Sequence, residues 1–143
     1  MTRRWESGTA TVEFVWLTIL LLVPFVYVLI AVFDTQRASY AVSAASRSAA
    51  RAYLMAADPA SAEERARIAA QVALGDQGVD ADVHISCLPS PADCMQPGSS
   101  VQVIVRTIQP LPLTPSVLGD QLGGIAVHST HTESFGTYRA GET

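Results

Sequence analysis

The sequence predicts an α+β fold: a long N-terminal helix whose first half spans a membrane, then a short helix and a small antiparallel sheet of about three strands. Residues 14–33 form an uncharged apolar run, and residues 34–57 are rich in Ala and lack Gly and Pro. From residue 79 onward, apolar and polar residues alternate, as in half-buried strands. We expect a leader at 1–8, the long helix at 9–57, a head at 58–135 and a flexible tail at 136–143.

The apolar run FVWLTILLLVPFVYVLIAVF, at residues 14–33, has the length of a membrane span. A helix of this length covers about 30 Å, which matches the hydrocarbon core of a bilayer. Only Thr18 and Pro24 interrupt the apolar side chains. Charged residues are 15% of the 143-residue chain, and the mean hydropathy is +0.27, which is unusual for a soluble domain. The net charge of −4 argues against nucleic-acid binding by phosphate neutralisation.

The helix is predicted to continue beyond the span as far as residue 57. Its alanines lie on one stripe at helical spacing, at positions 38, 41, 45, 49, 52 and 56. Arg37, Arg47 and Arg51 cluster on another face of the same helix. Two interpretations remain open. The Ala stripe packs on the chain's own head with the arginines in solvent, or these faces contact other subunits.

A second helix is predicted over residues 62–74, after Asp58 and Pro59 interrupt the first. Ser61 and Glu64 have the S-x-x-E spacing of a capping box, and Gly75 ends the helix. We expect its buried side to consist of Ala62, Ala66, Ala69 and Ala73, flanked by Ile68 and Val72.

Three strands are predicted from the alternation of apolar and polar residues. They cover residues 79–87, 101–106 and 125–135. The Pro-rich connection at 109–124 is expected to hold at most one helical turn.

Cys87 and Cys94 are the only cysteines and flank a Pro-rich loop. A disulfide between them would close a loop of about eight residues and stabilise the fold by about 2.5 kcal/mol. The alternative is a pair of reduced thiols. The side of a span with more basic residues usually faces the cytoplasm, but the arginines on the two sides of this span are nearly equal in number. The predicted orientation therefore depends on the cysteines. A disulfide requires an oxidising compartment, which places the head outside the cytoplasmic membrane and the N-terminus inside.

The N-terminal segment MTRRWESGTATVEF allows three interpretations. A secretory signal peptide would be cleaved near Val42–Ala44, although an apolar core of twenty residues is long for one. A twin-arginine signal would use Arg3 and Arg4. An uncleaved anchor fits the span but leaves Glu13 unexplained, because an ionisable group at the edge of a span is costly and is a functional candidate.

Gly8, followed by TATVE and about twenty apolar residues, resembles the junction of type IV pilin-like precursors. The resemblance implies that prepilin peptidase cuts after Gly8 on the cytoplasmic side, so that Thr9 becomes the first mature residue and Glu13 the fifth. It also implies that Glu13 pairs with the new α-amino group of a neighbouring subunit during assembly. Such pairing lowers the cost of a carboxylate in a medium of low dielectric constant.

The rest of the chain resembles the TadE-like minor pilins, or pseudopilins, of the tight-adherence pilus system. The similar segments are SAASRSAARAYL after the span, then VQVIVRTIQPLPLTP, and finally IAVHSTHTESF. Pro24 lies further from the glutamate than is usual in this family, and an arginine of the last strand is missing. The resemblance implies a single-pass protein of the bacterial inner membrane that acts in pilus assembly or secretion. Its partners would be prepilin peptidase, other pilin subunits, the assembly machinery and membrane lipid.

The chain lacks the phosphate-binding, nucleophile and zinc-protease motifs that would indicate an enzyme. His128 and His131 are separated by an odd number of positions, so a strand would send them to opposite faces and they could not chelate one metal ion. We therefore expect no catalytic residues, no metal site and no cofactor. The remaining alternatives are a permanently anchored binding or sensor module and a secreted domain released by signal peptidase.

Overall fold

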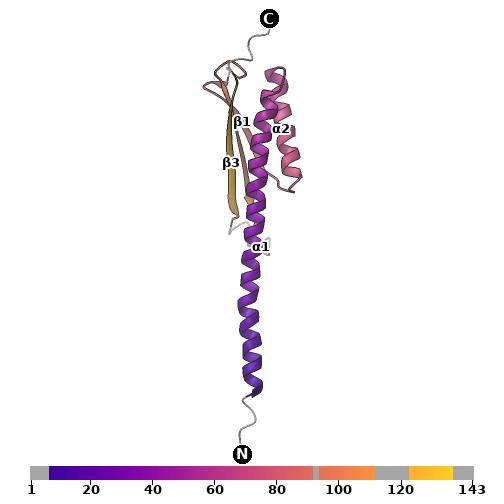
Figure 1. Ribbon diagram of the computed structural model, residues 1–143, viewed down its shortest axis with the longest axis vertical. Coiled ribbons are helices and arrows are strands. Elements are labelled where there is room, and N and C mark those ends of the chain that lie inside the picture. Colours follow the sequence, from indigo (N-terminus) through magenta and orange to yellow (C-terminus); the bar gives the residue numbers. More distant parts are fainter. Residues whose placement is uncertain (1–6, 92–93, 112–122, 137–143) are drawn as a thin grey trace, which may run out of the picture.

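The computed structural model describes residues 7–91, 94–111 and 123–136. Helix α1 (Ser7–Leu54) forms the long axis of the molecule (Figure 1). Helix α2 (Pro59–Gly75) lies beside the far half of α1, and a three-stranded sheet covers another side of that half. The near half of α1 carries no other element, so the described chain consists of a bare helix and a small head. The predicted α+β fold is confirmed.

Helix α1 is a single helix of 48 residues with Pro24 inside it. At about 1.5 Å per residue it extends about 70 Å, more than twice the thickness of a bilayer core. It begins at Ser7, inside the predicted leader, and ends at Leu54, close to the predicted end at residue 57. The amide of Met55 still donates to the Arg51 carbonyl at 3.0 Å, so the last turn closes beyond Leu54.

Helix α2 starts three residues earlier than predicted, and its cap is Asp58, so the predicted capping box of Ser61 and Glu64 is wrong. The Asp58 carboxylate accepts hydrogen bonds from the Ser61 amide and the Ser61 hydroxyl, both at 2.9 Å. Pro59 occupies the first turn, where its missing N–H costs nothing. The two carboxylate bonds lower the pKa of Asp58.

The predicted buried face of α2 is correct only in part. Ala62, Ala66, Ala70 and Leu74 are buried, whereas Ala69 and Ala73 are half-buried. Ile68 and Val72 were expected at the buried side, but they are 52% and 60% exposed. Because the buried face of α2 is mostly alanine, with Leu74 at its end, the two helices can approach closely, and Ile68 and Val72 remain on the outer side of α2.

The three strands form one antiparallel sheet in the order β1-β2-β3. Their bounds are Asp82–Leu88 for β1, Ser100–Gln109 for β2 and Ile125–Ser134 for β3. The second and third predicted strands are confirmed, the second being longer than expected. The first begins at Asp82 and not at residue 79, because the Val79 amide donates to the Leu74 carbonyl at 3.1 Å and belongs to the turn after α2.

The core lies between α1, α2 and one face of the sheet. From the sheet it takes Val101, Val103 and Val105, which are at most 2% exposed. From α1 it takes the predicted Ala stripe, in which Ala52 is half-buried and the other five alanines are buried. The Ala stripe therefore packs on the chain's own head, and the arginine face of α1 is left exposed.

Three sequence expectations fall wholly or mostly outside the described residues. They concern the leader up to residue 6, the helical turn expected in the connection at 109–124, of which 112–122 are not described, and the tail from residue 137.

Candidate functional site

The candidate cleavage junction lies in the first turn of α1. Gly8 and Thr9 follow Ser7, the first helical residue. The first turn of a helix has backbone N–H groups without intrahelical acceptors, so it opens more easily than later turns. The predicted scissile bond between Gly8 and Thr9 is therefore in the least constrained part of the helix.

Glu13 lies about one turn further along α1, where the apolar surface begins. Its side chain is exposed, and its flanking neighbours Val12 and Phe14 are 70% and 69% exposed. Among the described residues, no side chain forms an ion pair or hydrogen bond with the Glu13 carboxylate. A carboxylate at the edge of an apolar surface therefore has no partner within the described part of its own chain.

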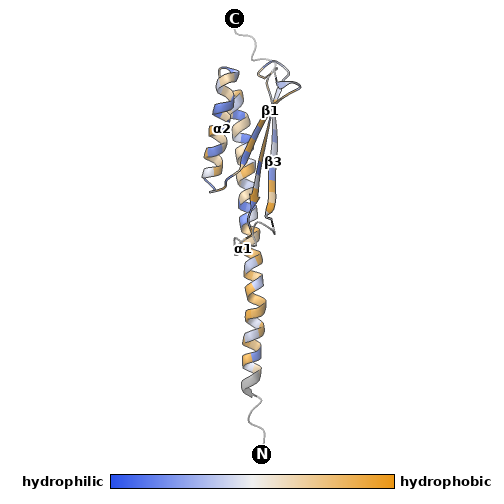
Figure 2. Ribbon diagram, turned by 180° about the vertical axis from the view of Figure 1, so that it is seen from behind, coloured by the Kyte–Doolittle hydropathy of each residue, from blue (hydrophilic) through white to orange (hydrophobic). Residues whose placement is uncertain are grey.

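Within the described residues, the predicted span is uncovered along most of its length. Every residue from 14 to 33 is exposed except Tyr27 and Ala31, which are half-exposed. Figure 2 shows this half of α1 as a predominantly hydrophobic helix with no other element beside it. The Thr18 hydroxyl donates to the Phe14 carbonyl at 2.8 Å, so its polar hydrogen is satisfied inside the helix. Residues 10–54 include one helix that is long and apolar enough to cross a membrane.

The head begins to pack on α1 immediately above the span. Ala38 is fully buried and Val42 is 1% exposed. Between them and the end of the helix, the Ser46 hydroxyl lies 3.1 Å from that of Ser129 on β3, which ties the helix to the outer strand. The buried side of residues 38–54 therefore belongs to the core of the head.

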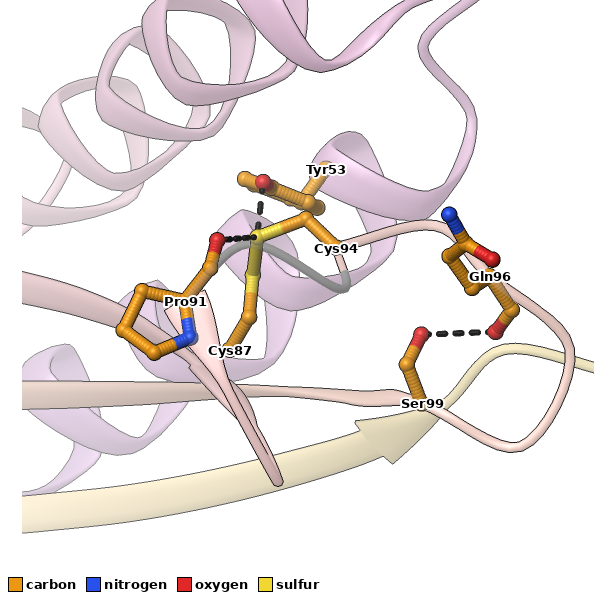
Figure 3. The surroundings of a disulfide bond; sticks show 6 residues. All are labelled: Tyr53, Cys87, Pro91, Cys94, Gln96 and Ser99. Atoms are coloured by element: carbon orange, nitrogen blue, oxygen red, sulfur yellow. Dashed lines mark hydrogen bonds between the residues drawn. A yellow bond between two sulfur atoms is a disulfide. The ribbon is translucent and has the colours of Figure 1, made fainter.

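The predicted disulfide between Cys87 and Cys94 is present, with a Cα–Cα distance of 5.4 Å (Figure 3). It joins the end of β1 to the loop that leads into β2. The Tyr53 hydroxyl, near the end of α1, donates to the Cys87 sulfur at 3.5 Å. The bridge therefore fixes the loop and lies against the last turn of the long helix.

Tyr53 contacts the bridge and is also affected by the charge of Glu63 on α2. The side chain is only 5% exposed. Burial, followed by the negative charge of Glu63, raises the pKa of the Tyr53 hydroxyl. The hydroxyl therefore stays protonated and remains a donor to the sulfur at any physiological pH.

The histidines of the last strand lie on opposite faces of the sheet, as the sequence predicts. His128 is opposite Arg106 on the exposed face, and His131 is opposite Val103 on the face toward α1. The His131 imidazole lies 3.1 Å from the Glu133 carboxylate. Within the described residues, no group of three or more His, Cys, Asp or Glu side chains is arranged to hold a metal ion.

Sequence reasoning missed three features of the head. These are the contact of Tyr53 with the bridge, the hydroxyl pair of Ser46 and Ser129, and the exposed aliphatic side chains of α2. The first two depend on pairings between distant segments, which no local pattern reveals. Comparison with protein-family models, with curated proteins and with solved structures finds no match.

Proposed function

We propose that the chain is a non-enzymatic, pilin-like membrane subunit that acts in the assembly or function of a tight-adherence-type pilus. It is made as a precursor and cut after Gly8 by prepilin peptidase. Residues 14–33 hold it in the bacterial cytoplasmic membrane, with the N-terminus inside and the head outside. Its partners are other pilin or pseudopilin subunits and the assembly machinery.

The observation that carries this proposal is Glu13. Its carboxylate is exposed, unpaired within the described residues, and located where a bare apolar helix begins. A simple anchor gains nothing from a charge at this position, since an ionisable group near hydrocarbon is costly without a partner. A neighbouring subunit that begins at Thr9 supplies a new α-amino group, and the charge pair offsets much of that cost.

The disulfide supports the proposed orientation. The Cys87–Cys94 bridge forms and persists in an oxidising compartment, so the head belongs on the outer side of the membrane. Only one helix of the described chain is long and apolar enough to span, which leaves the N-terminal end of α1 on the cytoplasmic side. There it is accessible to a peptidase that acts on that side.

The packing of the head argues against release by signal peptidase. A cut after Ala44 would separate Val42 from Ala45, which are 1% and 0% exposed. The freed domain would lose residues 38–44, including the buried Ala38, Ala41 and Val42, from the α1 segment that packs on the head. Cleavage after Gly8 leaves both the span and the core intact.

Substitution of Glu13 tests the proposal. In Glu13→Ala we expect normal cleavage after Gly8 but loss of incorporation into pili, because the carboxylate acts after cleavage. Val12→Ala, at a neighbouring site that is also exposed, should leave both unchanged. Immunoblots of sheared pilus fractions and of membranes measure the two steps separately. Wild-type incorporation of the Glu13→Ala protein would refute the proposed role of Glu13.

A further inference from the structure

The exposed face of α1 above the span carries an unpaired basic surface. We call it the α1 stripe, and it consists of Arg37, Tyr40, Arg47 and Arg51. Tyr40 is 74% exposed and the three arginines are exposed. None of the three arginines forms an ion pair with a described residue. Arg47 lies about 20 Å beyond the last residue of the span, more than twice the Debye length, so lipid phosphates do not account for it.

The outer face of α2 carries a surface of the opposite character. We call it the α2 ridge, and it consists of Glu64, Ile68, Val72 and Asp76, which are all exposed. These residues are spaced four apart and so form one continuous ridge, in which Asp76 is the C-cap directly after Gly75. Glu64 and Asp76 form no ion pair with a described residue, whereas the nearby Glu63 pairs with Arg67 at 2.7 Å.

The two surfaces match level by level along the molecular axis. Helices α1 and α2 are antiparallel neighbours joined by a short turn. The level of a residue is therefore its distance along the helix axis toward the span, measured from Leu54 on α1 and from Pro59 on α2. At about 1.5 Å per residue, Glu64 lies about 7 Å down, between Arg51 at about 5 Å and Arg47 at about 10 Å.

The match continues toward the membrane. Val72 lies about 20 Å down α2 and Tyr40 about 21 Å down α1. At the lower end, Asp76 and Arg37 are both about 25 Å down. Ile68 falls at the level of the half-buried Ala44, where a small side chain leaves room for a larger one. The acidic residues of the α2 ridge therefore lie at the heights of arginines of the α1 stripe. Its two apolar residues lie at the heights of Tyr40 and Ala44.

We propose that the α1 stripe of one copy binds the α2 ridge of a second copy of this chain. This inference rests on the proposed function as an assembling membrane subunit and specifies one contact that it uses. Copies held in one membrane have parallel long axes, so residues of equal level meet. The contact joins two different surfaces, so after pairing the first copy keeps a free ridge and the second a free stripe, and the array can continue.

Cross-linking in membranes tests the contact. Ala44→Cys and Ile68→Cys are placed in two differently tagged, full-length copies and treated with a short bis-maleimide. The native cysteines are bonded to each other and do not react. We expect the mixed pair to cross-link at least about tenfold more than either same-site pair. Ile108→Cys, on the opposite side of the head and 69% exposed, replaces Ile68→Cys as the control and should give only background. Equal yields in all pairs, or products only in same-site pairs, would overturn the proposal.

Charge reversal provides a second test of the contact, with the yield of the mixed cross-linked product as the readout. Arg51→Glu should lower the mixed product about tenfold, because like charges then face each other across the contact. Adding Glu64→Arg to the partner copy should restore it. Arg106→Glu, an exposed arginine on the outer face of the sheet, should have no effect. Equal loss in Arg51→Glu and Arg106→Glu, or no rescue by Glu64→Arg, would contradict the pairing.

The outcomes separate this contact from the proposed function. Cross-linking is measured in cells without the other assembly components, and incorporation into pili is measured in complete cells. Loss of incorporation in Glu13→Ala with an unchanged mixed product supports both claims. Unchanged incorporation in Glu13→Ala with the mixed product present refutes only the Glu13 role. Incorporation that depends on Glu13, without a mixed product in the wild-type pair, refutes only the α1–α2 contact.

Discussion

The two halves of α1 differ in what they require from their surroundings. Below residue 34, almost all large apolar side chains are exposed, and within the described part of the chain no helix or strand packs along them. Above it, small side chains such as Ala38, Ala45 and Ala49 are fully buried by α2 and the sheet. One helix thus has an upper half that is completed by its own chain and a lower half whose apolar surface the described elements leave exposed. Under the proposed function, we expect assembly to use the lower half and the uncovered face of the upper half.

The largest expected effect comes from a charge placed in the covered face of the upper half. Ala45→Glu buries an unpaired carboxylate, and we expect it to lower the stability of the head by about 3–5 kcal/mol. Ser48→Glu, on the exposed face, should change stability little. Limited proteolysis of the detergent-solubilised, full-length proteins measures the difference. Equal resistance of both variants would break the distinction between the two faces.

A charge in the lower half should impair membrane insertion and leave the stability of the head unchanged. Leu21 is 72% exposed, and Leu21→Arg places a charge at the centre of the span at a cost of about 3 kcal/mol for insertion. We expect a larger fraction of the protein to be extracted by alkaline carbonate, whereas the head keeps its protease resistance. Leu21→Phe is the matched control. A head that loses resistance in Leu21→Arg would show that the two halves are not independent.

Removal of the disulfide tests how much the bridge stabilises the head that covers the upper half. The variant Cys87→Ser with Cys94→Ser should lose about 2.5 kcal/mol of stability, because the bridge restricts a short loop in the unfolded chain. Urea unfolding of the solubilised protein measures the loss. Reductant should lower the wild-type midpoint toward that of the variant and leave the variant unchanged. A wild-type midpoint that ignores reductant would contradict a stabilising bridge.

The hydroxyl of Tyr53 is expected to contribute less, about 1 kcal/mol, through its bond to the Cys87 sulfur. Because its pKa is raised in the folded protein, its contribution is present at neutral pH and is lost as the pH rises above about 10. Tyr53→Phe should lower the urea midpoint at pH 7 and reduce the alkaline decline. If the urea midpoint of Tyr53→Phe falls at alkaline pH as much as that of the wild type, the fall is caused by groups other than Tyr53, and the prediction is wrong.

The smallest effect is expected at Asp58. Its carboxylate caps α2 and its pKa is lowered, so this stabilisation is present above the ordinary pKa of Asp and is lost as the pH falls through the lowered value. Asp58→Asn keeps an acceptor oxygen and should remove only the acid dependence. Asp58→Ala should also lower the stability at neutral pH. Helicity measured by circular dichroism from pH 7 to pH 2 tests both, and identical acid profiles in wild type and Asp58→Asn would contradict the assignment.

The parts of the fold that were predictable have strong local patterns. The apolar run predicts the bare half of α1, and the alternation around Val101, Val103 and Val105 predicts β2. The face of α2 was predicted only in part, because Ala69 and Ala70 are adjacent and equally small, and Ile68 and Val72 suggested the wrong side. The cap was also misassigned, since Asp58 and Ser61 are both good caps and only the observed hydrogen bonds distinguish them.

The candidate site was predictable to a different degree. Glu13 was singled out by its position at the start of the apolar run, and Gly8 and Thr9 were assigned from the resemblance to pilin-like precursors. The structure adds that Glu13 has no partner among the described residues. The disulfide was one of two alternatives at the sequence level and is present in the structure. The match between the α1 stripe and the α2 ridge depends on how the helices are paired in space, so the linear sequence does not reveal it.

The mass of the N-terminal peptide of the membrane-bound protein tests the central claim most directly. A pilin-like precursor cut after Gly8 gives a mature chain that begins at Thr9 and keeps the whole span. We predict that N-terminal mass spectrometry of the purified membrane fraction finds Thr9 as the first residue. An intact start at Met1 or Thr2 would indicate a permanent anchor, and a start at Ala45 would indicate release by signal peptidase. Either result would contradict the account.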